Sequence, residues 1–99
     1  MKTWPVTIRP RAEADVKKAR QWYDNARSGL GDEFLTEVRN SVRMLERIPE
    51  SRPVYYRGFR RLFTARFPYK LFYRIEGERV IVFRILHAKQ DHVRNLTSP

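Results

Sequence analysis

The hydrophobic positions begin with a short alternating segment and then change to a helical period. Val6 and Ile8 alternate with polar neighbours, which predicts a strand over Trp4–Arg9. From Pro10 to about Arg27, apolar residues recur at alternating spacings of four and three, the pattern of one helix face. This stripe consists of Ala12, Val16, Ala19, Tyr23 and Ala26.

A second helical stripe follows after the glycine-containing break at Ser28–Gly31. It runs from about Leu30 to Ile48, and Pro49 ends it because proline cannot continue a helix. The connection between the two helices is short, so we expect them to form an antiparallel hairpin.

The period changes to two after the second helix. Glu50–Gly58 is expected to be a loop with an extended piece at Val54–Tyr56. Three strands are then predicted, at about Arg60–Phe67, Lys70–Glu76 and Arg79–His87. The links between them are short enough for hairpins, which predicts an antiparallel meander.

These elements give the order β-α-α-β-β-β and predict one α+β domain over residues 1–99. The simplest arrangement is an antiparallel sheet with the helical hairpin packed on one face. The first strand should join at a sheet edge, although the pattern does not reveal its neighbour. The tail from Ala88 to Pro99 is polar, and we expect its end to fray.

Alternation along the strands assigns their side chains to the two faces of the sheet. We expect the more apolar set to face the helices: Phe63, Ala65, Phe67, Leu71, Tyr73, Ile75, Ile81, Phe83, Ile85 and His87. The opposite face would carry four cations and five apolar residues: Arg66, Lys70, Arg74, Arg84, Leu62, Phe72, Val80, Val82 and Leu86. No predicted element remains to cover this second face, so we expect an exposed, arginine-rich concavity.

The charge distribution strengthens the expectation of a partner for that face. Residues 1–51 hold ten Lys and Arg against eight Asp and Glu, whereas residues 52–99 hold eleven against three. The net charge of +10 therefore belongs mostly to the second half. Such a surface attracts a polyanion or an acidic protein segment. Arginine also offers a planar fork that matches phosphate and carboxylate groups.

Other features of the sequence limit the chemistry that the protein can perform and the cellular compartment in which we expect it. The chain has no cysteine, which excludes disulfides and thiolate catalysis. No run approaches the roughly 20 apolar residues of a membrane span, and no signal-peptide pattern is present. We therefore expect a cytoplasmic protein that does not enter a membrane. The two histidines, His87 and His92, lack supporting ligands, so no metal or other cofactor is expected.

Several segments together resemble the RelE/ParE superfamily of toxins from type II toxin–antitoxin systems. The run Arg61–Ile75 is similar to the central hairpin of that superfamily, and Val80–His87 is similar to the strand that follows it. The first half fits at Ala12–Val16, at Trp22–Tyr23, at Phe34 and at Ile48–Pro49. The likeness covers nearly the whole chain and depends on the order and spacing of these motifs.

The resemblance implies a growth inhibitor, of the kind linked to plasmid stabilization, that a cognate antitoxin holds inactive. The antitoxin would wrap the toxin with an acidic, extended or amphipathic segment, giving a toxin–antitoxin hetero-oligomer. Opposite charges would speed this association. The residues expected to bind antitoxin or target are Arg66, Lys70, Phe72, Arg74, Val82, Arg84 and Leu86.

The resemblance leaves two targets open. Toxins like ParE poison DNA gyrase, whereas toxins like RelE cut messenger RNA on the ribosome. A nuclease needs cations and proton-transfer groups, for which Arg66, Arg84, Lys70, His87 and Tyr73 are candidates. Strand parity, however, places His87 and Tyr73 away from the arginines.

RelE-like nucleases also resemble one another in a lysine cluster and a C-terminal aromatic or histidine. The tail of this chain keeps only His92. We therefore favour a ParE-like inhibitor over an endoribonuclease. A plain nucleic-acid-binding domain that uses the arginine face is a third hypothesis.

Overall fold

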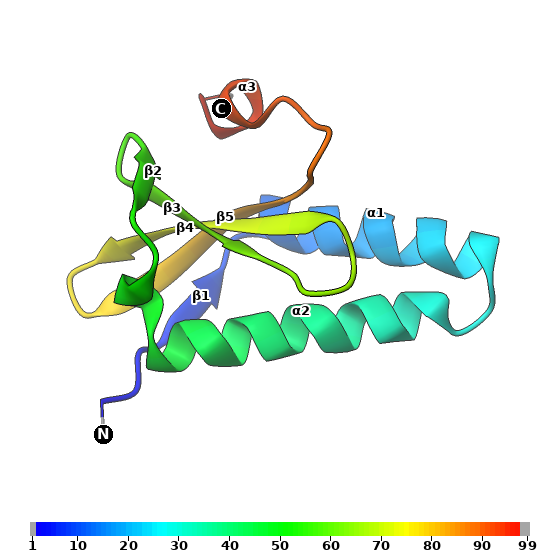
Figure 1. Ribbon diagram of the computed structural model, residues 1–99, viewed down its shortest axis with the longest axis horizontal. Coiled ribbons are helices and arrows are strands. Elements are labelled where there is room, and N and C mark those ends of the chain that lie inside the picture. Colours follow the sequence, from blue (N-terminus) through cyan, green and yellow to red (C-terminus); the bar gives the residue numbers. More distant parts are fainter. Residues whose placement is uncertain (1, 98–99) are drawn as a thin grey trace.

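The computed structural model describes residues 2–97 and shows a sheet with a helical hairpin against one of its faces (Figure 1). The predicted α+β fold and the order β-α-α-β-β-β are confirmed, with one short strand and one short helix added. The elements are β1 (Val6–Ile8), α1 (Pro10–Ala26), α2 (Leu30–Arg47), the 3-10 turn η1 (Pro49–Ser51), β2 (Val54–Tyr56), β3 (Phe59–Phe63), β4 (Tyr69–Glu76), β5 (Arg79–His87) and α3 (His92–Thr97).

The five strands form one sheet in the order β1-β5-β4-β3-β2. All neighbours are antiparallel except β1, which pairs with β5 in parallel through Val6 and Val80, so the sheet is mixed. The edge position predicted for the first strand is confirmed, but the wholly antiparallel sheet is wrong. β1 takes the outer edge of β5, whereas β2 folds back on β3 and forms the other edge of the sheet.

The main core lies between the helices and one face of the sheet. Its helical side comes from the two predicted stripes, and its sheet side includes Leu71, Tyr73 and Ile85, each at most 1% exposed. The Tyr73 hydroxyl donates a hydrogen bond to the Pro49 carbonyl at 2.6 Å, and burial raises the pKa of this tyrosine. The bond satisfies a buried polar group and joins η1 to the sheet.

A β-bulge in β5 reverses part of the predicted face assignment. Phe72 pairs with Arg84, but the next residue of β4, Tyr73, pairs with Val82, so Phe83 is the extra residue. An extra residue shifts the alternation by one position. Val80 and Val82 therefore face the helices, and the prediction that they lie on the opposite face is wrong.

The same shift places Phe83 away from the helices, against Phe59, contrary to its predicted position. Beyond the bulge the original parity is restored. Ile85 faces the helices and Leu86 the opposite face, as predicted.

The strand β3 ends at Phe63, four residues earlier than predicted, because Thr64 begins a turn. The Thr64 hydroxyl donates to the carbonyls of Phe67 and Tyr69, and these bonds replace strand pairing. The prediction assumed that side chains alternate along one continuous strand as far as Phe67. Because the strand ends at Phe63, that count assigns the residues before the turn to the wrong faces. Leu62 lies in the main core opposite Leu71, and Phe63 lies on the other face.

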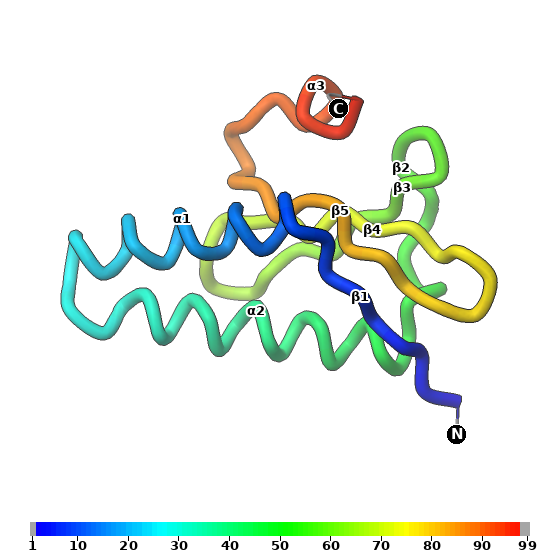
Figure 2. The backbone as a smooth tube through the Cα atoms, turned by 180° about the vertical axis from the view of Figure 1, so that it is seen from behind, coloured from blue at the N-terminus to red at the C-terminus, as the bar shows by residue number. Residues whose placement is uncertain are grey.

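The helix α3 was not predicted. Figures 1 and 2 both show it on the side of the sheet away from α2. Its Leu96 packs against a second cluster that Phe59, Phe72 and Leu86 form on the face opposite the main core. We call this face the reverse face. The expected fraying of the tail concerns residues 98–99, outside the described residues.

Candidate partner-binding surface

Arg84 is not a free cation of the reverse face. It lies beside the bulge, and its Nε and Nη2 donate to the Asp15 carboxylate of α1, each at 2.8 Å. The side chains of this pair are only 11% and 15% exposed. The hydrogen bond from Arg84 to Asp15 raises the pKa of the guanidinium, which therefore stays charged.

Asp15 also accepts the backbone N–H of Ile85 at 2.9 Å. Beyond Ile8, β1 has ended, so this carboxylate takes the place of a neighbouring strand at the edge of β5. The Arg84–Asp15 pair therefore fastens α1 to the sheet, and the prediction that Arg84 is exposed for a partner is wrong.

Arg66 lies on the helix side. Its backbone N–H donates to Glu37 at 2.7 Å, and its guanidinium bonds to Glu33, both on α2. The hydrogen bond from Arg66 holds the pKa of Glu33 below its usual value. The predicted place of Arg66 on the reverse face is wrong because the Thr64–Pro68 turn bends toward α2.

Three apolar residues of the predicted surface are buried. Val82 faces the helices, and Phe72 and Leu86 lie on the reverse face as predicted, but all three are fully covered. His92 of α3 packs against Phe72 in a tilted arrangement with ring centroids 4.8 Å apart, and Tyr55 contacts the same ring from β2. The exposure of Phe72 and Leu86 to a partner was overestimated because α3 was not foreseen, and that of Val82 because the bulge in β5 was not foreseen.

The other two predicted cations, Lys70 and Arg74, do lie on the reverse face. Arg74 stacks over Phe59 at 4.0 Å and donates to the Arg57 carbonyl at 2.9 Å. Lys70 points across to β3, where its Nζ lies 4.8 Å from the centroid of the Phe63 ring.

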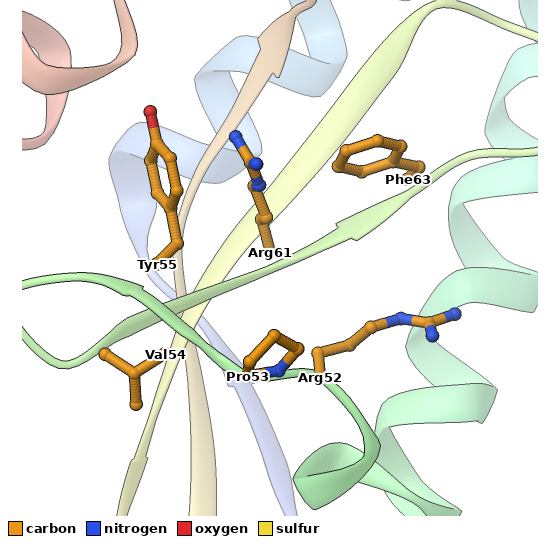
Figure 3. A pocket seen from close by; sticks show the side chains of 6 residues that line it. All are labelled: Arg52, Pro53, Val54, Tyr55, Arg61 and Phe63. Atoms are coloured by element: carbon orange, nitrogen blue, oxygen red, sulfur yellow. The ribbon is translucent and has the colours of Figure 1, made fainter.

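The sequence interpretation missed a partly exposed group of residues around Lys70. We call it the Arg61 patch, and it consists of Arg52, Val54, Tyr55, Arg61, Phe63 and Lys70. Five of these, with Pro53, line an open hollow of about 550 Å³ (Figure 3). In Figure 3 the side chains of Tyr55, Arg61 and Phe63 stand on the same side of β2 and β3.

Cations and aromatic rings alternate across the Arg61 patch. The Arg61 guanidinium lies 3.8 Å from the centroid of Tyr55 and 5.4 Å from that of Phe63. Phe63 is 57% exposed and Tyr55 38% exposed. Partial burial, reinforced by the charge of Arg61, lowers the pKa of Lys70. The lining residues include no carboxylate.

A sequence signal for this surface exists. In β3, Arg61 and Phe63 alternate with buried Leu62, and the extended piece before β3 carries exposed Tyr55. The interpretation of these residues failed because the strand was continued through the turn to Phe67. The turn from β2 to β3 is sharp, with positive φ at Arg57 and Gly58, and it brings Tyr55 beside Arg61.

Of the candidate nuclease residues, Lys70 alone belongs to the patch. The His87 ring lies edge-on to Tyr69, and its Nδ1 accepts the Lys89 N–H at 3.0 Å. His87 and Arg84 line one hollow beside α1, whereas Arg66 lines another against α2. Tyr73 is buried in the main core.

Within residues 2–97, no three His, Asp or Glu side chains come together as they would to hold a metal ion. Among the helices of the same range, none has the length and apolar character needed to cross a bilayer.

Solved structures of toxin–antitoxin systems share this fold. One, titled as the chromosomal ParDE system from P. aeruginosa, has a TM-score of 0.73 and 20% identity, covering 86% of this chain and 96% of that chain. Another, the RelBE2 toxin–antitoxin complex from Mycobacterium tuberculosis, has a TM-score of 0.60 and 21% identity, covering 86% and 98%.

Sequence comparison identifies the family. A search of curated proteins finds no match. Residues 6–92, however, match the family described as the ParE toxin of type II toxin–antitoxin system, parDE. That match spans most of the chain and confirms the predicted resemblance. This chain belongs to the ParE toxin family.

Proposed function

We propose that this chain inhibits bacterial growth by binding a large cytoplasmic target, DNA gyrase, and that a cognate antitoxin neutralises it. The family match over residues 6–92 supports a toxin. The similar structures are titled as toxin–antitoxin systems or complexes, which supports an antitoxin partner. A part in plasmid stabilization belongs to the same proposal.

The observation that carries the proposal is the chemistry of the Arg61 patch. Its lining offers cations and rings but no histidine and no carboxylate, which leaves the Tyr55 hydroxyl as the lining group that could move a proton. Apart from Lys70, which belongs to the patch, the cations and the histidine that a nuclease would use are engaged elsewhere: Arg84 with Asp15, Arg66 with Glu33, and His87 with Lys89. Cleavage of RNA needs proton transfer at the reacting atoms, whereas inhibition by binding does not.

The antitoxin segment would meet the reverse face with its acidic side chains. Arg61, Lys70 and Arg74 are the cations of this face that a carboxylate would pair with. An apolar side chain of the antitoxin could pack on Phe63, which is more than half exposed. Phe72 and Leu86 form a buried floor beside this surface.

Induction of the chain in bacteria without its antitoxin tests the proposal. We expect growth to stop, a DNA-damage reporter to switch on, and purified gyrase to lose supercoiling activity when the protein is added. Co-expression of the antitoxin should restore growth. Rapid cleavage of messages on ribosomes, without the damage response, would contradict the proposal and favour the RelE-like ribonuclease.

A further inference from the structure

We propose that a cavity between α1 and the outer edge of β5 binds a small planar aromatic carboxylate. The ring of this ligand packs on Trp22, and Lys18 and Tyr69 hold its carboxylate. The cavity, which we call the α1 cavity, has a volume of about 680 Å³, a size typical of small-molecule sites. It shares no lining residue with the Arg61 patch, so the inference goes beyond the proposed function. The lining residues that carry the argument are Asp15, Lys18, Trp22, Tyr23, Tyr69 and His87.

The α1 cavity exists because β1 is shorter than β5. The strand β1 ends at Ile8, opposite Val82, whereas β5 continues to His87. Beyond Val82, no strand within residues 2–97 lies along this edge of β5, and the cavity opens between the edge and α1. Ala19 and Ile85, both buried, are among its lining residues.

The backbone donors of this edge are already satisfied by side chains. Asp15 accepts the Ile85 N–H at 2.9 Å, and the side chain of Gln90 accepts the His87 N–H at 2.7 Å. A partner segment that adds to a sheet as a strand needs such donors to be free. The α1 cavity therefore suits a ligand that side chains recognise, and not an added strand.

Four aromatic rings follow one another along the α1 cavity. Trp22 meets Tyr23 edge-on, with ring centroids 5.2 Å apart. Tyr69 lies 6.2 Å from Tyr23 and 5.3 Å from His87. Trp22 is 66% exposed, although the tyrosine beside it is buried. Its indole therefore offers an open apolar surface on which a planar ring can pack.

The polar groups beside these rings are hydrogen-bond donors. Lys18 lies one turn before Trp22 on α1, and within residues 2–97 no carboxylate forms an ion pair with it. Burial raises the pKa of Tyr69, and Tyr23 and Asp15 raise it further, so its hydroxyl stays protonated. None of the hydrogen bonds within residues 2–97 uses that hydroxyl. An ammonium and a phenol hydroxyl together match the two oxygens of a carboxylate.

The charges of the α1 cavity favour an anion over a cation. The Asp15 carboxylate accepts two hydrogen bonds from Arg84 and one from the Ile85 N–H, which compensates its charge. Among the lining residues, Lys18 is left without an opposite charge, in a chain with a net charge of +10. An anionic ligand is attracted to such a site, and a cationic ligand is repelled.

The test is a titration of the full chain with 2-naphthoate, which has a flat fused ring and one carboxylate. Cell-free synthesis supplies the protein labelled with nitrogen-15, and two-dimensional NMR follows the indole N–H signals of Trp22 and Trp4. We expect the Trp22 signal to shift saturably. The Trp4 signal should stay in place, because Trp4 is buried elsewhere and its N–H donates to Glu46 of α2.

Two further probes separate the ring from the charge. The amide 2-naphthamide keeps the planar ring and loses the charge, whereas decahydro-2-naphthoate keeps the charge and loses the planar ring. By calorimetry, each should bind at least about fivefold more weakly than 2-naphthoate, the effect of losing one charge-assisted hydrogen bond or one aromatic contact.

Variants assign these preferences to side chains. Lys18→Met should reduce the preference for 2-naphthoate over 2-naphthamide to less than about twofold, because it removes the charge and keeps an unbranched side chain. Lys17→Met is the matched control, since Lys17 is the neighbouring exposed lysine of α1 and does not line the cavity. It should leave the preference unchanged. Trp22→Ala should weaken both naphthyl probes about equally, and Tyr69→Phe should weaken 2-naphthoate.

Three results would overturn the inference. If 2-naphthamide or decahydro-2-naphthoate bound as tightly as 2-naphthoate, the cavity would be a general apolar hollow. A preference for 2-naphthoate that survives Lys18→Met would place its carboxylate elsewhere. A Trp22 signal that does not shift at the solubility limit of the probe, or a Trp4 signal that shifts equally, would contradict a site at α1.

The inference and the proposed function fail separately. A chain that arrests growth but does not bind 2-naphthoate contradicts only the inference. A chain that binds 2-naphthoate but leaves growth and gyrase unaffected contradicts only the proposed function.

Discussion

The reverse face of the sheet has two ends that use the same residue types differently. At one end Phe72 is fully buried between His92 of α3 and Tyr55 of β2. At the other, two residues away along β4, Lys70 lies against Phe63, which is 57% exposed. The first end is a small core, whereas no helix or strand within residues 2–97 lies over the second end.

The arginines divide in the same way. Arg84, near α3, is bonded to the largely buried carboxylate of Asp15 and stabilises the fold. Arg61, in the patch, stacks on rings, and within residues 2–97 no carboxylate is within ion-pairing distance of it. A basic, aromatic surface therefore marks a candidate binding site only where its cations are not already in ion pairs within the protein and its rings are not already buried.

The largest expected difference between the two ends is in stability. Phe72→Ala should lower the free energy of unfolding by about 4 kcal/mol, because it leaves a cavity in a closely packed cluster. Phe63→Ala removes an exposed ring and should change it by less than about 0.5 kcal/mol. Urea unfolding followed by circular dichroism measures both. Equal losses would mean that Phe63 is also part of a core.

A second difference concerns the ion pairs. Asp15→Ala removes the partner of Arg84 and the acceptor of the Ile85 N–H, and should cost about 3 kcal/mol. Asp32→Ala breaks the exposed pair with Arg20 and should cost less than about 1 kcal/mol. Chemical denaturation of the two variants under the same conditions compares them, and similar costs would argue against a structural role for Asp15.

A smaller effect tests whether α3 belongs to the covered end. His92→Ala removes the ring that packs against Phe72 and should lower the free energy of unfolding by about 1 kcal/mol. Amide hydrogen exchange should then accelerate in α3 while the strand β4 stays protected. If exchange in α3 is already as fast in the unchanged protein as in a free peptide, the cover does not persist in solution.

The smallest effect tests the placement of Arg66 on the helix side. Because the bond from Arg66 lowers the pKa of Glu33 in the folded state, it contributes stability above the ordinary pKa of 4.5. That contribution is lost as the pH falls through the lower folded-state pKa. The stability difference between the unchanged protein and Arg66→Ala should therefore shrink as the pH falls below 4.5. When both chains also carry Glu33→Gln, the cost of Arg66→Ala should not depend on pH.

Hydrophobic periodicity was sufficient to predict the two long helices, the strands β4 and β5, and the packing of the helical hairpin on one face of the sheet. Long amphipathic stripes are compatible with few other structures. Periodicity failed where a single residue changes which face of the sheet the neighbouring side chains occupy. The bulge at Phe83 and the turn at Thr64 each moved neighbouring side chains to the other face. Neither a bulge nor a turn produces a repeating pattern of hydrophobic residues by which the sequence would reveal it.

The candidate site was therefore predicted only in part. Lys70 and Arg74 were placed on the correct face, but Arg61, Phe63 and Tyr55 were missed. The cover over Phe72 depends on α3, six residues whose position comes from tertiary contacts rather than from a long apolar stripe. Short polar segments of this kind carry little signal in sequence.

The central claim is that the Arg61 patch, and not the covered end, is where this toxin meets other proteins. Its most direct test compares colony counts after induction, without antitoxin, of the unchanged chain and of the double variant Arg61→Ala with Phe63→Ala. Matched protein levels and melting temperatures would show that both chains are folded. The account predicts that the double variant lets cells grow. Undiminished killing by the folded double variant would contradict it.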